Sequence, residues 1–61
     1  MLTKADINKT VKIKYRRDKN IYHTFTGIVF KVRKQSFTLL VNDEMKVSIG
    51  FRNIKEREFI K

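Results

Sequence analysis

The sequence predicts a single all-β domain of four or five short antiparallel strands, folded as a small barrel or a meander. Two observations predict this class. Apolar and polar residues alternate in four separate segments, and polar turn residues separate them at intervals of roughly ten residues. The chain has 61 residues, which is enough for one domain with a small core. We therefore expect residues 1–61 to form one domain.

The N-terminal third predicts a helical turn followed by a strand. In the stretch TKADINK, residues 3–9, Thr3 stands in an N-cap position and Asp6 follows three residues later, as in a capping box. Residues 10–17 alternate strictly, which is typical of a half-buried strand. One side of this strand carries Val11, Ile13 and Tyr15, and the other carries Lys12, Lys14 and Arg16.

The stretch DKN, residues 18–20, has turn chemistry and predicts an antiparallel hairpin with the long run 21–32. In the later half of this run Ile28, Phe30 and Val32 alternate in phase. Gly27 lies inside it, which indicates a sharp bend, a bulge or a close approach of another backbone.

Two further strands, near residues 36–41 and 46–51, end in polar or turn residues. FRNI, residues 51–54, fits a 3₁₀ turn, and IKEREFIK, residues 54–61, fits either a short strand or a helical turn. The predicted core is Val11, Ile13, Tyr15, Ile28, Phe30, Val32, Phe37, Leu39, Val41, Val47, Ile49, Phe51 and Ile54.

The positive charge is segregated along the chain. Fifteen Lys and Arg oppose six Asp and Glu, for a net charge of +9. Residues 9–34 carry nine of the bases and Asp18 as their only acid, whereas residues 35–61 are nearly balanced. A segregated field of this kind attracts polyanions, although a charged face also serves solubility.

The sequence lacks the combinations of nucleophile, base or metal ligands that catalysis requires. There is no cysteine, and His23 is the only histidine, so we expect no metal site, no cofactor, no small-molecule substrate and no enzymatic activity. Glu56 and Glu58 read as solvated charges. Gly27 and Gly50 are isolated and form no phosphate loop. The polar N-terminus and short apolar runs predict a cytoplasmic protein without membrane contact.

The run FTGIVFKVRKQSFTLLVNDEMKVSIGFRNIKE, residues 25–56, resembles strands 2 to 5 of SH3-like barrels, and among them the Sm-like proteins. The resemblance implies a short N-terminal helix, a bent second strand that contains a glycine, and a turn before the last strand. It does not extend to the Sm RNA site. The family's Asp falls on Arg33 and its base-reading Asn on Phe37, and FRNI replaces the loop signature, so the uridine pocket is not carried over.

The first functional hypothesis is a nucleic-acid-binding module, for DNA or RNA, that contacts the phosphate backbone. Bases would neutralise phosphates, and aromatic side chains beside them would stack on nucleobases. Tyr22 and Phe25 also fit a packing role, and the lysines of the first strand also fit a solvated edge. The predicted binding residues are Lys12, Lys14, Arg16, Arg17, Tyr22, His23, Phe25, Lys31, Arg33 and Lys34.

The second hypothesis is a protein-interaction module or homo-oligomer, for example a small accessory factor of a phage or mobile element. Small barrels bind peptides at exposed strand edges. Four apolar residues fall outside the predicted core phase and would form such a surface: Val29, Leu40, Phe59 and Ile60. Binding to a polyanion weakens with salt, and an apolar contact does not, which separates the two hypotheses.

Overall fold

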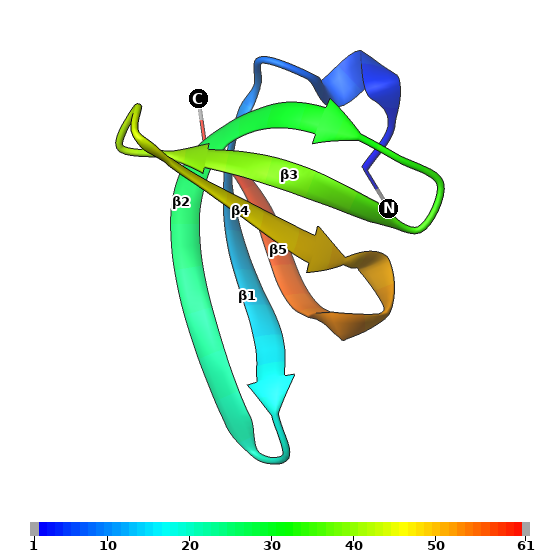
Figure 1. The fold of residues 1–61 in the computed structure, drawn as a ribbon, viewed down its shortest axis with the longest axis vertical. Coiled ribbons are helices and arrows are strands. Elements are labelled where there is room, and N and C mark those ends of the chain that lie inside the picture. The colour runs from blue at the N-terminus through cyan, green and yellow to red at the C-terminus, as the bar shows by residue number, and fades with distance from the viewer. Residues whose placement is uncertain (1, 61) are drawn as a thin grey trace.

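A computed structural model describes residues 2–60, and it confirms the all-β class (Figure 1). Five strands form one antiparallel sheet, and the only helices in this part of the chain are two 3₁₀ turns. In chain order the elements are η1 (Lys4–Asp6), β1 (Thr10–Asp18), β2 (Ile21–Val32), β3 (Ser36–Val41), β4 (Met45–Gly50), η2 (Phe51–Asn53) and β5 (Ile54–Ile60).

The sheet has the strand order β4-β3-β2-β1-β5 and does not close into a barrel. Strand β2 is long and curved, so that its first part lies beside β1 and its last part lies beside β3 (Figure 1). The β3–β4 hairpin thereby folds across β1 and β5. Within residues 2–60, β4 and β5 each pair with one neighbour only, and they are the two edges of the sheet.

The ends of the elements follow the turn chemistry of the sequence. Asp6 accepts a hydrogen bond from the backbone N–H of Thr3 at 2.9 Å, as the capping-box pattern predicts. Asn20 and Asn42 adopt the left-handed conformation, with φ of 65° and 57°, in the β1–β2 and β3–β4 turns. Asparagine tolerates this conformation because its side chain bonds to the nearby backbone. IKEREFI, which the sequence left open, forms strand β5.

The folded sheet has two layers, one formed by β1, β5 and the first part of β2 and the other by β3, β4 and the last part of β2, and the core lies between them. Six of the predicted core residues are buried and five more pack against them in half-buried positions: Val11, Ile13, Phe37, Leu39, Val41 and Ile49, then Tyr15, Val32, Val47, Phe51 and Ile54. Leu2 and Val29 are also buried. The prediction was wrong for Ile28 and Phe30, which are exposed at 37% and 46%.

A bulge at Phe30 explains this error. Val29 lies opposite Leu39 and Lys31 lies opposite Thr38, so Phe30 is an extra residue in β2. Each bulge shifts the alternation by one residue. The odd-numbered residues therefore face inward up to Val29, and the even-numbered Val32 faces inward after the bulge. The sequence pattern assigned one phase to the whole run.

Gly27 lies three residues before the bulge, in regular pairing with Val11. Its backbone dihedral is not left-handed, so the glycine is not required by a turn. It is required by a close approach: a β-carbon at this position would collide with the carbonyl oxygen of Leu40 and lie 3.1 Å from Leu39 Cγ. The predicted close approach is therefore present, and the bulge is at another residue.

Candidate nucleic-acid interface

The β1–β2 hairpin carries seven of the ten predicted binding residues. Its strands pair antiparallel from Thr10 opposite Ile28 to Asp18 opposite Ile21, and Lys19 and Asn20 form the turn. This confirms the predicted hairpin. The register shifts between Arg16 and Asp18, which leaves Arg17 as a bulge beside the tip. In Figure 1 the hairpin extends beyond the rest of the sheet.

One face of the hairpin, which we call the outer face, points away from the core. It carries three bases at alternate positions of β1, which we call the basic row: Lys12, Lys14 and Arg16. Lys12 lies opposite Thr26, Lys14 opposite Thr24, and Arg16 opposite Tyr22. Lys12 and Arg16 are exposed and Lys14 is half-buried. The Lys14 ammonium lies 5.5 Å from the centre of the Tyr22 ring.

His23 and Phe25 lie on the other face of the hairpin. The predicted core phase of Ile28, Phe30 and Val32, extended backward along β2, places them on the face of the lysines, and this prediction was wrong. They are half-buried and form an aromatic cluster with Tyr15, whose ring centre is 6.1 Å from that of His23 and 6.0 Å from that of Phe25. Arg17 Nη1 lies 3.3 Å from His23 Nε2. The sequence placed His23 and Phe25 with the lysines because it assigned β2 the phase that holds only after the bulge.

Lys31, Arg33 and Lys34 lie at the opposite end of β2 from the hairpin turn. Lys31 pairs with Thr38 of β3, and the backbone N–H of Arg33 donates to the carbonyl of Ser36 at 2.7 Å. Strand β1 pairs with β2 only as far as Ile28, so these three bases lie beyond the part of β2 that pairs with β1. Pairing through the DKN turn predicts Arg33 and Lys34 near Lys9 and Lys12, at the far end from Arg16 and Arg17. The structure places them at that far end, but Thr26, the partner of Lys12, lies seven positions before Arg33 in the chain.

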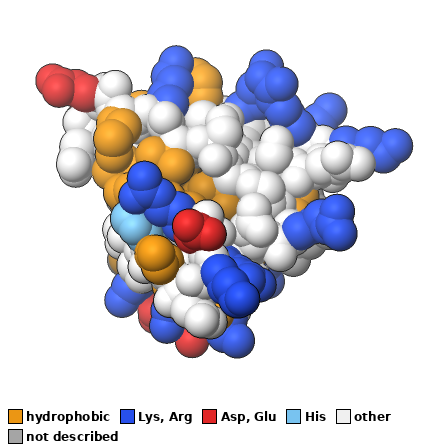
Figure 2. All heavy atoms as spheres, turned by 60° about the horizontal axis from the view of Figure 1, so that its bottom comes forward, with side chains coloured by type: hydrophobic (Ala, Val, Ile, Leu, Met, Phe, Trp, Pro, Cys, Tyr) orange, Lys and Arg blue, Asp and Glu red, His pale blue; other side chains and the backbone are white. Residues whose placement is uncertain are grey.

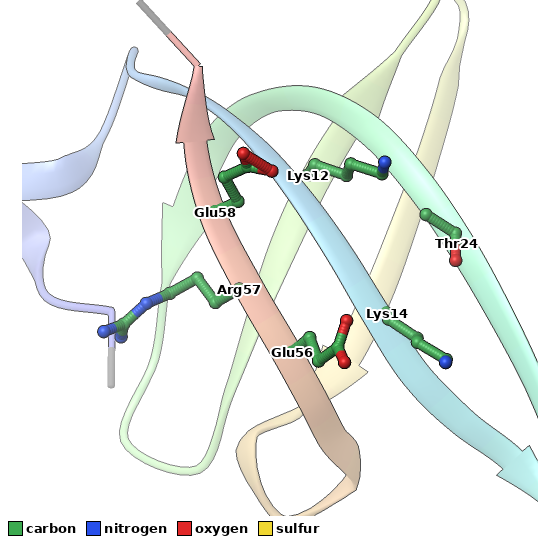
Figure 3. Close-up of a pocket in the computed structure, with 6 residues that line it drawn as sticks. All are labelled: Lys12, Lys14, Thr24, Glu56, Arg57 and Glu58. Atoms are coloured by element: carbon green, nitrogen blue, oxygen red, sulfur yellow. The ribbon is translucent and has the colours of Figure 1, made fainter.

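Two glutamates that the sequence assigned to solvated charge lie beside the basic row. In the β1–β5 pairing, Glu58 is opposite Lys12 and Glu56 is opposite Lys14. Figure 3 shows these four side chains and Thr24 around a shallow depression on the outer face, while Arg57 points away from it. Within residues 2–60 the only ion pair joins Lys9 to Asp6, so the glutamates lower the local charge without a direct contact to the lysines.

The sequence had no signal for this opposition. The pairing depends on which residues of β1 and β5 meet, and a register shift between Lys14 and Tyr15 sets it. Alternation in a short charged strand leaves the register free. The local charge of the outer face is therefore a property of the fold.

The end of the molecule that carries the hairpin tip is turned toward the viewer in Figure 2. Lys and Arg side chains lie at the top, right and bottom of this view, acidic side chains lie at the upper left, and hydrophobic side chains reach the surface mainly on the left half. Three exposed aromatic rings each have a cation over them: Tyr22, Phe30 and Phe59. A cation over a ring is attracted by the negative face of the π-system.

No group of three or more acidic, histidine or cysteine side chains that could hold a metal ion occurs in residues 2–60. Neither helical turn of that region has the length or hydrophobicity needed to cross a bilayer. Comparison with known proteins finds no family model, no curated protein and no solved structure that matches the chain.

Proposed function

We propose that this protein binds nucleic acid, DNA or RNA, mainly through the phosphate backbone. The observation that carries the proposal is the basic row Lys12, Lys14 and Arg16, which lies on one outer face of an extended hairpin. Cations at alternate positions of a strand point in one direction, so they present a line of charge that suits a phosphate backbone. Arg17 and Lys19 add positive charge at the tip.

The segregation of charge supports a polyanion more than simple solubility. Solubility needs charge of either sign spread over the surface. Here nine bases and one acid fall within residues 9–34, and the hairpin brings five of those bases together. A concentrated positive field of this kind raises the association rate with a polyanion.

A salt titration of binding tests the proposal. Binding of labelled DNA and RNA is measured by fluorescence anisotropy from about 50 mM salt upward, where phosphate contacts weaken steeply. We expect the combined variant Lys12→Gln, Lys14→Gln and Arg16→Gln to bind more weakly to every sequence. The slope of log affinity against log salt should shrink by about 0.7–0.9 for each lost phosphate contact.

The matched control removes the same charge elsewhere. Lys4, Arg52 and Lys55 are exposed and lie in η1, η2 and β5. Their combined change to Gln should leave most of the affinity and the slope intact. If the control loses as much as the hairpin variant, net charge and not the basic row drives binding. Absence of salt-sensitive binding by the wild-type protein would end the proposal.

The two glutamates give a test in the opposite direction. Glu56→Gln with Glu58→Gln removes two negative charges opposite Lys14 and Lys12. We expect affinity for nucleic acid to rise, because the phosphates no longer meet repulsion from β5. Loss of fold would lower affinity, so a gain cannot be a side effect of unfolding. An unchanged affinity would show that the ligand lies away from this face.

A second function, binding of a protein partner or a second copy, has one observation in its favour. Phe59 and Ile60 are exposed at 41% and 42% on the free edge strand β5. An unpaired edge with apolar side chains is a site for strand addition. Such binding would persist at high salt, and Phe59→Ala would weaken it. Sedimentation of the protein at increasing concentration, in high salt, distinguishes self-association from nucleic-acid binding.

A further inference from the structure

The outward-facing side chains of β2 form an exposed row that the core does not explain. We call Tyr22, Thr24, Thr26, Ile28 and Phe30 the β2 row. All five are exposed, with Tyr22 at 43%, Ile28 at 37% and Phe30 at 46%. Strand β2 is hydrogen-bonded to β1 on one side and to β3 on the other. The row therefore lies on the face of the sheet and not at an edge that a further strand would cover.

An aromatic ring stands at each end of the row, and each ring has a lysine over it. Lys14 Nζ lies 5.5 Å from the centre of the Tyr22 ring, and Lys46 Nζ lies 4.2 Å from the centre of the Phe30 ring. Lys14 comes from β1 and Lys46 from β4. The two lysines thus reach the row from opposite flanks of β2, across the same face of the sheet.

The pairing pattern places all these groups on one face. Ile28 is opposite Leu40, and Leu40 is opposite Lys46, so Lys46 shares the outer face with the β2 row. On the other side, Lys14 is opposite Thr24 and Lys12 is opposite Thr26. The bulge turns Phe30 outward and thereby adds the second ring. Bulges are over-represented beside functional sites, and contiguous exposed apolar surface often marks a binding site.

Rings, nearby cations and hydroxyls together match the chemistry of a single strand of nucleic acid. In a single strand the faces of the bases are free to stack on aromatic side chains, while cations hold the phosphates. In a duplex those faces are stacked on one another, so a flat exposed ring offers it little. The threonine hydroxyls between the rings add hydrogen-bond donors and acceptors.

We propose that the β2 row binds a single-stranded nucleic acid, with bases stacked on Tyr22 and Phe30 and phosphates held by Lys14 and Lys46. This inference rests on the proposed function and adds the strandedness of the ligand. Tyr22 and Phe30 are eight positions apart in the chain, which is about 26 Å along a straight strand and less along a bent one. A segment of several nucleotides spans that length.

Phe59 is the other exposed aromatic residue with a cation over it, and it provides the control. Lys9 Nζ lies 5.5 Å from its ring centre. Phe59 is opposite Val11, which is buried, so it belongs to the inner face of the edge strand β5. It has the same chemistry as Tyr22 and Phe30 but a different face. Binding along the β2 row does not involve it.

The experiment compares a single strand of about 12 nucleotides with a duplex of the same length, as DNA and as RNA, by fluorescence anisotropy. We expect the wild-type protein to bind the single strand more tightly. Tyr22→Ala and Phe30→Ala should each lower single-strand affinity about 5- to 150-fold and leave duplex affinity nearly unchanged. Tyr22→Phe and Phe30→Tyr, which keep a ring, should bind like the wild type, and so should Phe59→Ala.

The outcomes separate this inference from the function on which it rests. Equal affinity for single strand and duplex, with alanine variants that bind like the wild type, would overturn stacking on the β2 row and leave phosphate binding intact. Weakening by Phe59→Ala to the same extent would also overturn it. A lack of salt-sensitive binding to any probe would remove both proposals. Thermal unfolding of each variant confirms that the comparison is made between folded proteins.

Discussion

Gly27→Ala tests the close contact that allows β2 to bend over β3. A β-carbon at this position would collide with the carbonyl oxygen of Leu40 and lie 3.1 Å from Leu39 Cγ. The carbonyl belongs to the backbone of a paired strand, so it cannot rotate away as a side chain can. The two strands must separate locally, at the place where Ile28 pairs with Leu40. The strain therefore falls on the junction between the two layers.

The magnitude follows from two opposing effects. In an ordinary strand, alanine is more stable than glycine by roughly 0.5–1 kcal/mol. Overpacking of a tight contact costs about 1–3 kcal/mol, and here it outweighs that gain. A domain of this size has a free energy of unfolding of about 3–9 kcal/mol. We therefore expect a net loss of stability of up to about 2.5 kcal/mol, with a fall in the melting temperature of up to about 20 °C.

Gly50→Ala is the matched control for this experiment. A β-carbon at Gly50 would meet only Asn53 Nδ2 at 3.5 Å and the carbonyl oxygen of Gln35 at 4.0 Å, which are ordinary contacts. Its φ is −72°, which alanine adopts freely. This variant should be as stable as the wild type or more stable by about 0.4–1 kcal/mol. Thermal unfolding followed by circular dichroism measures both. If Gly27→Ala matched Gly50→Ala in stability, the close approach would be wrong.

The remaining predictions concern the core and the N-terminal turn. Leu39→Ala should lower the free energy of unfolding by roughly 2–5 kcal/mol because Leu39 is fully buried. Leu40→Ala, on the outer face, should lower it much less. Urea unfolding compares the two variants, and a reversed order of the two losses would contradict the register of β3. The hydrogen bond from the Thr3 N–H lowers the pKa of Asp6 from its ordinary value. The stability that this carboxylate contributes is complete above about pH 4 and is lost as the pH falls through the lowered pKa. Asp6→Asn should remove that part of the acid sensitivity in melting curves between about pH 2 and pH 6, and an unchanged acid profile would contradict the role of the turn.

The alternation of the sequence predicts the strands well, and it fails where the chain departs from strict alternation. In β1 and β3, strict alternation identifies the buried residues Val11, Ile13, Leu39 and Val41. In β2, the bulge at Phe30 changes the phase inside one unbroken run of strand residues. An extra residue in a strand costs little stability locally, and no particular amino-acid type marks its position. The alternation of apolar and polar residues therefore cannot reveal it. It becomes visible only when β2 pairs with β3.

The same limit applies to the binding residues. Lys12, Lys14 and Arg16 share a face, as the alternation of the first strand predicts, and the observed pairing adds Tyr22 to that face. His23 and Phe25 were assigned to the wrong face because the phase of the later half of β2 was extended backward. The position of Glu56 and Glu58 depends on the β1–β5 pairing between segments about forty residues apart. Such long-range register is decided by packing of the whole sheet.

The outer face combines three neighbouring strands of different chemistry, and their order constrains how a ligand would lie on it. Strand β5 presents Glu56 and Glu58, β1 presents the basic row, and β2 presents hydroxyls and aromatic rings. On the proposals above, phosphates are attracted to Lys14 of β1 at one end of the β2 row and to Lys46 of β4 at the other, and they are repelled from the β5 side. The backbone of a bound strand therefore follows β2 and stays away from β5. Its bases are then directed to the neutral β2 row. The glutamates would thus orient the ligand while lowering its affinity. Removing them should raise the affinity for nucleic acid and reduce the preference for a single strand over a duplex. If affinity and preference rose together, the glutamates would have no orienting role.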